Sequence, residues 1–243
     1  MISLVPSNSL RTFLGEATET YYQSLKENPD AVEYLKSRGL SGANVQYFRL
    51  GYVANPLPGH ERYAGRISIP YVTRSGVTDI RFRALPTLID GEWQNPVGAK
   101  MLSAPGAPPR LYNTQDLDRR EPFICICEGE PDTWIAHQAG LPAVGVPGID
   151  NWSEWWGRCF KGYSTVYVLA HNDALKKRNG CRPCAAEGHE ECQGHNVGSD
   201  FADKLAAQIP NARAVLMPPG HDVNSFVQAE GAEALITRIG VKP

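Results

Sequence analysis

The second half of the chain alternates short apolar runs with amphipathic segments, and no other feature restricts the fold as strongly. The run 123–127 (FICIC) is wholly apolar, as a strand buried on both faces of a parallel sheet must be. Strands that alternate with helices pair in parallel, so the pattern predicts an α/β fold with a doubly wound parallel sheet and helices on both faces. Further strands are expected at 141–148, 164–170 and 212–217, and helices at 131–140, 151–160, 199–209 (capped by Ser199) and 231–240.

Carboxylates follow three of these strands. Glu128 comes directly after the first strand, and Asp132 lies four residues later. Asp173 and Asp222 follow the third and fourth strands. Ligand sites of parallel sheets lie beyond the carboxyl ends of the strands, so the four side chains are expected at one edge. Gathering like charges costs free energy unless a cation lies among them, and carboxylate oxygens suit Mg²⁺ or Mn²⁺. Taken singly, Asp132 is more simply explained as a helix cap, and Asp173 and Asp222 as loop residues; it is the arrival of all four at the carboxyl ends that favours a site.

The first half of the chain has a different pattern. Helices are expected at 11–27 and 30–38, where apolar residues recur at helical spacing. Two strand-like runs around a Ser-Gly turn fill residues 64–84. The predicted organisation is therefore a smaller α+β basic lobe over 1–118, followed by the parallel-sheet domain over 119–243.

The charge is unevenly distributed along the chain. The net charge is −2, but residues 60–113 hold seven basic and four acidic side chains, a net charge of +3. Arg81 and Arg83 lie two residues apart in a strand-like run, so both are expected on one strand face, where a pair suits a track of phosphates. Ordinary variation of surface charge explains the imbalance equally well.

A polar segment before the helix at 199–209 carries three cysteines and two histidines. Six cysteines in the whole chain are too few and too clustered for a disulfide scaffold, which indicates the cytoplasm. Two closely spaced pairs of ligands suit the tetrahedral geometry of structural Zn²⁺, so a zinc knuckle is expected at 180–196. His189 is an alternative fourth ligand, and a loop of free thiols is the other interpretation. The spacing is Cys181-x2-Cys184-x7-Cys192-x2-His195.

Several motifs resemble those of DnaG-type primases. In the second half, ICEGEPDTW, VYVLAHNDA and LMPPGHDVNSF resemble the Glu-Gly-x-x-Asp, Asp-x-Asp and closing Gly-x-Asp motifs of the TOPRIM fold as it occurs in these primases. In the first half, the stretches 33–53, 64–85 and 99–113 resemble the segments that precede this fold in the same proteins. Their joint order along the chain is more specific than any single motif.

The resemblance implies a DNA primase-type RNA polymerase that makes short RNA primers on single-stranded DNA by metal-dependent nucleotidyl transfer. The implied partners are the DNA template, ribonucleoside triphosphates, and a replicative helicase or a second primase subunit. The implied catalytic residues are Glu128, Asp132, Asp173 and Asp222, of which Glu128, Asp173 and Asp222 would bind Mg²⁺ or Mn²⁺. Contacts with template or nucleotide phosphates are expected from Arg66, Arg81, Arg83 and Lys100. The resemblance supports Arg83 and Lys100 best. For Arg66 and Arg81, an ordinary solvated position on a strand accounts for the charge as well as phosphate contact does.

Two positions depart from the family pattern. His171 stands where the first Asp of Asp-x-Asp is expected, and Asn224 stands where a later acid is expected. A neutral imidazole is a poor ligand for Mg²⁺ and a better one for Zn²⁺ or Mn²⁺. Either one metal site binds its ion weakly, or Asn172 and Asp173 take over the role of the missing aspartate. The resemblance is to the catalytic core, so we expect a minimal version of phage or plasmid type.

Two other functions stay open at this point. One is a non-catalytic, primase-like subunit that binds nucleic acid, and the other is a TOPRIM nuclease. The basic upstream segment argues against the nuclease. Because the chain has no apolar run near the roughly 20 residues of a membrane helix and no recognisable signal peptide, no membrane association is expected.

Overall fold

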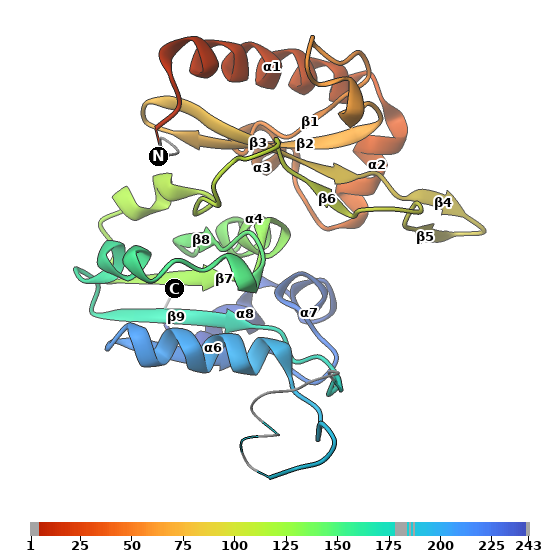
Figure 1. Ribbon diagram of the computed structural model, residues 1–243. Helices are drawn as coiled ribbons and strands as arrows, with labels where there is room; N and C mark the ends of the chain where they lie inside the picture. The colour runs from red at the N-terminus through yellow and green to blue at the C-terminus, as the bar shows by residue number, and fades with distance from the viewer. Residues whose placement is uncertain (1–4, 178–183, 185, 187, 242–243) are drawn as a thin grey trace. The chain divides into compact units, whose positions relative to one another are not determined.

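The computed structural model describes residues 5–177, 184, 186 and 188–241. The chain divides into two compact units, Met1–Gln115 and Asp116–Pro243 (Figure 1). Among the described residues, none of the helices has the length and hydropathy that a membrane span requires.

The first unit contains an antiparallel sheet and a separate β-ribbon. The sheet has the strand order β1-β2-β3-β6. The two longest strands form a hairpin, in which Arg66 pairs with Ala84 and Ile69 with Arg81. The strands are β1 (Gly51–Tyr52), β2 (Arg66–Thr73), β3 (Gly76–Ala84) and β6 (Met101–Leu102), and the ribbon is β4 (Thr87–Ile89) and β5 (Glu92–Gln94).

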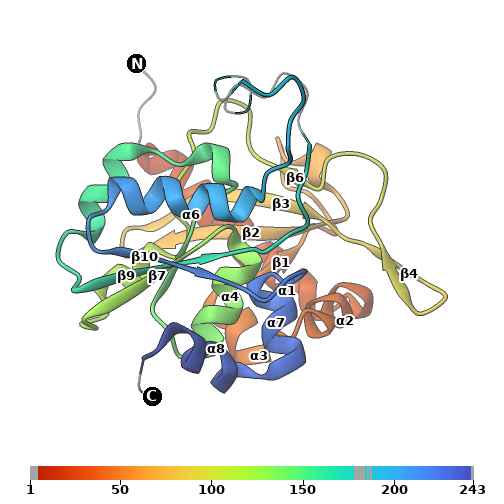
Figure 2. The same cartoon turned by 90° about the horizontal axis from the view of Figure 1, so that it is seen from below.

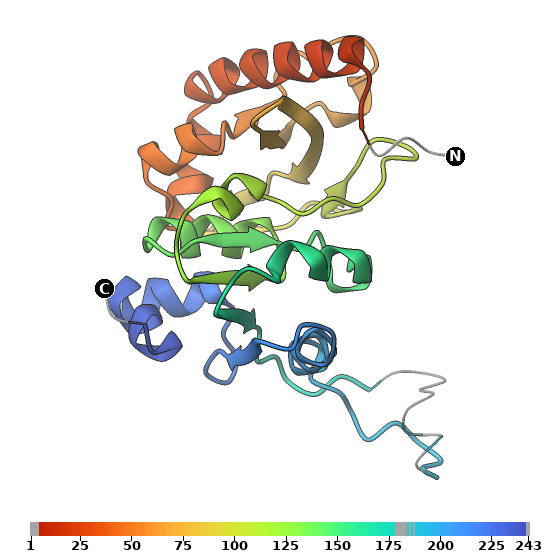
Figure 3. The same ribbon diagram turned by 90° about the vertical axis from the view of Figure 1, so that its left-hand side faces the viewer.

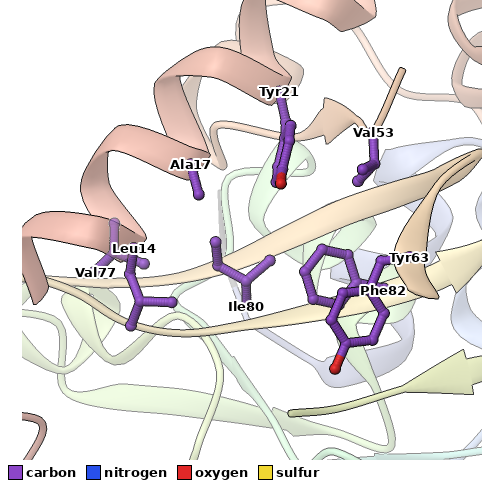
Figure 4. Packing of buried hydrophobic residues seen from close by; sticks show 8 residues of the cluster. All are labelled: Leu14, Ala17, Tyr21, Val53, Tyr63, Val77, Ile80 and Phe82. Atoms are coloured by element: carbon purple, nitrogen blue, oxygen red, sulfur yellow. The ribbon is translucent and has the colours of Figure 1, made fainter. Parts of the chain in front are cut away.

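Helix α1 packs its apolar face on this sheet (Figure 4). Leu14, Ala17 and Tyr21 meet Ile80 and Phe82 of β3 in one buried cluster. Each α-helix begins at a side chain that accepts a backbone N–H, a cap that satisfies one of the free donors at the start of a helix. The sequence did not indicate the third helix. The helices of this unit are α1 (Asn8–Lys26), α2 (Pro29–Ser37), α3 (Gly42–Tyr47) and the short 3₁₀ helix η1 (Glu61–Tyr63).

The second unit is built on the predicted parallel sheet. Its strands follow the order β10-β9-β7-β8, and all three pairings are parallel. Helix α6 covers one face, and α4, α7 and α8 lie on the other (Figures 2 and 3). The strands are β7 (Phe123–Cys127), β8 (Ala143–Gly145), β9 (Thr165–Ala170) and β10 (Ala212–Leu216). The helices are η2 (Thr114–Asp118), α4 (Glu130–Gln138), α6 (Val197–Gln208), α7 (Val223–Glu230) and α8 (Ala232–Ile239).

Two local predictions for this unit were wrong, and one helix was missed. The helix expected at 151–160 is instead two 3₁₀ helices, η3 (Ile149–Asn151) and η4 (Glu154–Phe160), because Trp152 takes an extended conformation between them. Helix α6 is capped by Asn196 rather than Ser199, since Asn196 Oδ1 accepts the Ser199 N–H at 3.1 Å. Helix α7 was not expected at all.

Candidate active site

The carboxyl edge of the parallel sheet gathers three of the four predicted carboxylates around a histidine. Glu128 follows β7, Asp132 lies in the first turn of α4, and Asp222 is the N-cap of α7. His171 follows β9. One ligand atom each from Asp132, His171 and Asp222 lie within 4.8 Å of one another. Glu128 joins this group through His171, whose Nδ1 is 3.7 Å from the Glu128 carboxylate.

His171 is the centre of this site, although the sequence indicated it only as a departure from a family pattern. Its Nε2 lies 2.6 Å from Asp132 Oδ2. Its backbone N–H donates to Glu128 Oε1 at 2.8 Å. The two carboxylates it joins are 8% and 5% exposed. Buried carboxylates need a positive partner, and the imidazolium provides one here.

The electrostatics of the site are those of a compensated acidic cluster. Burial lowers the pKa of His171, but the hydrogen bond to Asp132 and the charges of Asp132, Glu128 and Asp222 outweigh burial and raise the pKa to about 9. Burial also raises the pKa of Glu128, and the charge and N–H of His171 offset this only in part. At neutral pH, His171 is therefore a cation among carboxylates.

This charge predicts how stability depends on pH. Protonated His171 stabilises the metal-free fold below its ordinary pKa of 6.5, and the stabilisation is lost as the pH rises through about 9. With a chelator present, we expect the free energy of unfolding in urea to fall by on the order of 2 kcal/mol between about pH 6.5 and pH 9.5. His171→Gln is expected to flatten this part of the curve. An equally steep fall in the variant would contradict the assignment.

Asp132 and Asp222 also hold the start of helix α7. The Asn224 N–H donates to Asp132 Oδ1 at 3.2 Å. Asp222 Oδ1 accepts the Ser225 N–H at 2.6 Å, and Ser225 Oγ in turn accepts the Asp222 N–H at 3.0 Å, which forms a capping box. Asn224 itself is buried, and its side chain accepts from Gln228.

Asp173 lies apart from this group. Its side chain is 42% exposed and lies 3.3 Å from Lys176 Nζ. Its charge contributes to the raised pKa of Glu128. The neighbouring Asn172 points inward and donates to the Met217 carbonyl at 3.0 Å. The structure thus brings Asp132, Glu128 and Asp222 to His171, and it leaves Asp173 at the rim.

Gly198 is a site residue that sequence reasoning missed. It is the second residue of α6, and its backbone passes directly against the acidic edge. A Cβ built there would lie 2.7 Å from Glu128 Oε1 and closer still to the His171 carbonyl oxygen. Only glycine fits this approach. A Gly within a helix pattern, two residues beyond an N-cap, is the signal that could have drawn attention to it.

The donor set fits a hard divalent cation. Carboxylate oxygens with one imidazole suit Mn²⁺ well and Mg²⁺ less well. A cation bound by Glu128, Asp132 and Asp222 would take over the charge compensation that protonated His171 provides. The carboxylates are buried and raise the pKa of His171, which shows that this edge favours a positive charge, and a bound metal would supply one.

The predicted basic residues lie on β2, β3 and the segment that leads into β6. Arg81 and Arg83 share one face of β3, as predicted, while Arg66 pairs with Ala84 and so lies on the opposite face. Arg83 is buried, and its Nε donates to the Tyr34 hydroxyl at 2.8 Å. Arg81 Nε donates to Ser103 Oγ at 3.2 Å, and Arg66 donates to the Ala99 carbonyl at 3.0 Å. Lys100 is exposed, and its carbonyl accepts the Ala84 N–H.

The predicted zinc ligands are grouped as far as the structure describes them. Ligand atoms of Cys184, Cys192 and His195 lie within 4.8 Å of one another. Cys181 lies outside the described residues. The group uses His195 and does not include His189, whose backbone N–H donates to the Cys184 carbonyl at 2.9 Å.

Comparison with known proteins shows where this chain belongs. No model of a known protein family matches it. The Gene 57 protein of Mycobacterium phage D29 is 36% identical over 182 residues, which cover 73% of this chain and 99% of the phage protein. A DNA primase of Pseudomonas putida is 25% identical over 277 positions, which cover 96% of this chain. The chain spans 38% of the length of that primase.

Solved structures give the same result for the fold. A DNA primase domain from Pseudomonas aeruginosa has a TM-score of 0.69 at 23% identity, covering 95% of this chain and 78% of the other. A DnaG primase catalytic domain bound to single-stranded DNA has a TM-score of 0.67 at 20% identity, covering 96% and 80%. The chain therefore belongs to the family of the phage Gene 57 protein, its other curated relatives are DNA primases, and its fold is that of DnaG-type primase catalytic cores.

Proposed function

We propose that this chain is an RNA polymerase of the primase type, which makes short RNA primers on single-stranded DNA. The observation that carries this proposal is the group of Glu128, Asp132 and Asp222 around His171 at the carboxyl edge of a parallel sheet, in a chain whose relatives include DNA primases. We assign this edge as the metal-binding edge of a TOPRIM domain. Ligands of parallel sheets bind at this edge.

The reaction is the attack of a primer 3′ hydroxyl on the α-phosphorus of a ribonucleoside triphosphate, with pyrophosphate as the leaving group. Bound Mg²⁺ or Mn²⁺ would supply charge neutralisation on the attacking and leaving oxygens. Glu128, Asp132 and Asp222 would supply the negative charge that binds the cation. Asp173, at the rim, would help to hold or orient it.

The first lobe, residues 1–118, would hold the template and the incoming nucleotide. Arg66, Arg81 and Lys100 are the candidates for direct phosphate contact. Arg83 is buried against Tyr34, so we assign it to shaping the strand face. Primases of the same fold have been solved with single-stranded DNA and with a double-stranded oligomer that carries a 6-nucleotide overhang. Zn²⁺ is the second cofactor we propose, and a helicase or second primase subunit is the proposed protein partner.

Removal of metal gives the first test. The purified chain, with single-stranded templates of mixed sequence, labelled ribonucleotides and Mg²⁺ or Mn²⁺, is expected to yield short RNA products. Products should disappear when the divalent cation is chelated and return when Mn²⁺ is added back. Incorporation should also require template. Products that persist in chelator would contradict the role of the acidic edge.

A non-catalytic subunit that binds nucleic acid is the second candidate, and His171 is the observation that favours it. Protonated His171, held by Asp132, places a positive charge where the family pattern has the negative charge of an aspartate. Such a subunit would bind single-stranded DNA equally well with and without Mn²⁺ and would incorporate no nucleotide. Cleavage of the template in the same assay would instead indicate a nuclease.

A further inference from the structure

Two residues near the ends of the segment between β9 and α6 are paired with each other. Lys176 and His195 form an isolated antiparallel bridge, in which each backbone N–H donates to the other residue's carbonyl, at 2.9 and 3.0 Å. The segment between them, of which the structure describes 177, 184, 186 and 188–194, is referred to below as the insertion. Two of the grouped metal-binding side chains, Cys184 and Cys192, lie in this insertion, and His195 closes it.

The three side chains have the arrangement of a zinc site. Cys184 Sγ lies 3.3 Å from His195 Nε2. Tetrahedral zinc, with its usual bond lengths to sulfur and nitrogen, holds these two atoms about 3.6 Å apart. Both cysteines are buried. On the other side of the ring, His195 Nδ1 lies 3.5 Å from Asp200 Oδ2, which is the carboxylate partner that fixes a zinc-ligating imidazole.

Asn196, the next residue, connects this group to the acidic edge. Its Oδ1 caps α6. Its Nδ2 donates to Asn172 Oδ1 at 2.8 Å and to the Asp173 carbonyl at 3.0 Å. One side chain therefore fixes the first turn of α6 and the segment after β9 relative to each other.

Asn172 carries the connection on to Asp222. The Asn172 N–H donates to the His221 carbonyl at 3.1 Å, and the Asn172 carbonyl accepts the Gly220 N–H at 2.8 Å. The turn held in this way ends at Asp222. The path from His195 to Asp222 thus consists of direct hydrogen bonds and adjacent residues.

We propose that Zn²⁺ bound by Cys184, Cys192 and His195 sets the geometry of the acidic edge through Asn196, so that zinc loading strengthens binding of Mn²⁺ there. The coupling rests on the proposed use of divalent metal at that edge. Its physical basis is that bound zinc would fix the position of His195 and thereby restrict the adjacent residue, Asn196. Asn196 in turn holds Asn172 and Asp173 through its side-chain hydrogen bonds.

Asn196→Asp separates the parts of this connection. The variant keeps the oxygen that caps α6 and keeps every zinc-binding side chain. It replaces the donor to Asn172 and Asp173 with a second oxygen, which repels both acceptors. Gln193→Glu makes the same chemical change on an exposed residue of the insertion and is the matched control.

The experiment measures zinc content by elemental analysis and Mn²⁺ affinity by electron paramagnetic resonance, on the full chain. We expect zinc-loaded Asn196→Asp to bind Mn²⁺ about tenfold more weakly than wild type, with zinc content unchanged. The added negative charge by itself would strengthen Mn²⁺ binding. Weaker binding would therefore come from the lost hydrogen bonds to Asn172 and Asp173. Gln193→Glu should match wild type. Equal Mn²⁺ affinity in Asn196→Asp and wild type would overturn the proposal.

Hydrogen exchange gives a second readout that does not depend on Mn²⁺ binding. Zinc addition to the zinc-free wild-type chain is expected to slow exchange at amides 171–173 and 220–222, and this slowing should be lost in Asn196→Asp. If wild type binds no Mn²⁺ but shows the slowing, the proposed metal function fails and the effect on Mn²⁺ binding fails with it, while the structural connection from zinc to the acidic edge stands. Exchange that zinc leaves unchanged would disprove the coupling.

Discussion

Glu128→Gln is expected to lower ribonucleotide incorporation by about 100-fold or more while the fold is retained. Glutamine keeps the oxygen that accepts the His171 N–H, which lies 2.8 Å from Glu128 Oε1. It removes the negative charge that would bind the cation. Burial raises the pKa of Glu128, so the charge itself does not stabilise the fold. We therefore expect the free energy of unfolding to change by less than about 1 kcal/mol.

The measurement is the rate of template-dependent primer synthesis, together with urea unfolding of the same preparations. Glu121→Gln is the control, because this exposed carboxylate lies before β7 and faces Arg119 at 3.8 Å, outside the group around His171. Its variant should have wild-type activity. If Glu128→Gln kept more than about a tenth of the activity, Glu128 would not be the central metal-binding residue.

Gly198→Ala is expected to be the most damaging substitution of a single methyl group at this site. Alanine favours a helix over glycine by about 1 kcal/mol. Here the methyl group would lie 2.7 Å from Glu128 Oε1 and would also overlap the His171 carbonyl. Such overpacking costs roughly 1–3 kcal/mol, because α6 or the segment after β9 must move. With the helix gain subtracted, we expect a net loss of up to about 2 kcal/mol in unfolding free energy, and a loss of Mn²⁺ binding.

Gly15→Ala provides the comparison. Gly15 lies inside helix α1, and a Cβ there would have no atom within 4 Å. Its substitution should stabilise the chain by about 0.5–1 kcal/mol in the same urea experiment. A Gly198→Ala variant that is as stable as Gly15→Ala would show that α6 does not approach Glu128 as closely as described.

The parallel sheet was predictable because its strands are apolar on both faces. FICIC at β7 and the β-branched run at β9 carry that signal in their own residues. The edge positions of Glu128 and Asp222 followed from topology alone. By contrast, the 3₁₀ geometry at 149–160 depends on how Trp152 and Trp156 pack, which periodicity does not contain.

The internal arrangement of the site was not predictable from the pattern. His171 could be recognised as unusual, but its role depends on the 2.6 Å contact with Asp132 across two elements. The closeness of Gly198 to Glu128 depends on the path of α6. Asp173 matches the family motif by position, yet its side chain lies with Lys176 at the rim. Each of these features depends on distances between side chains or elements, which a sequence pattern does not contain.

The two oxygens of Asp132 have different tasks: Oδ2 holds His171, and Oδ1 holds the N–H of Asn224 at the start of α7. In the proposed function, metal binding and folding therefore share a single side chain. In a mutational scan, variants at position 132 are expected to lose cellular abundance and the proposed primer synthesis together. At position 128, where the charge is not needed for folding, the two measures would diverge. Tolerance scores at these neighbouring carboxylates thus report different properties of the molecule.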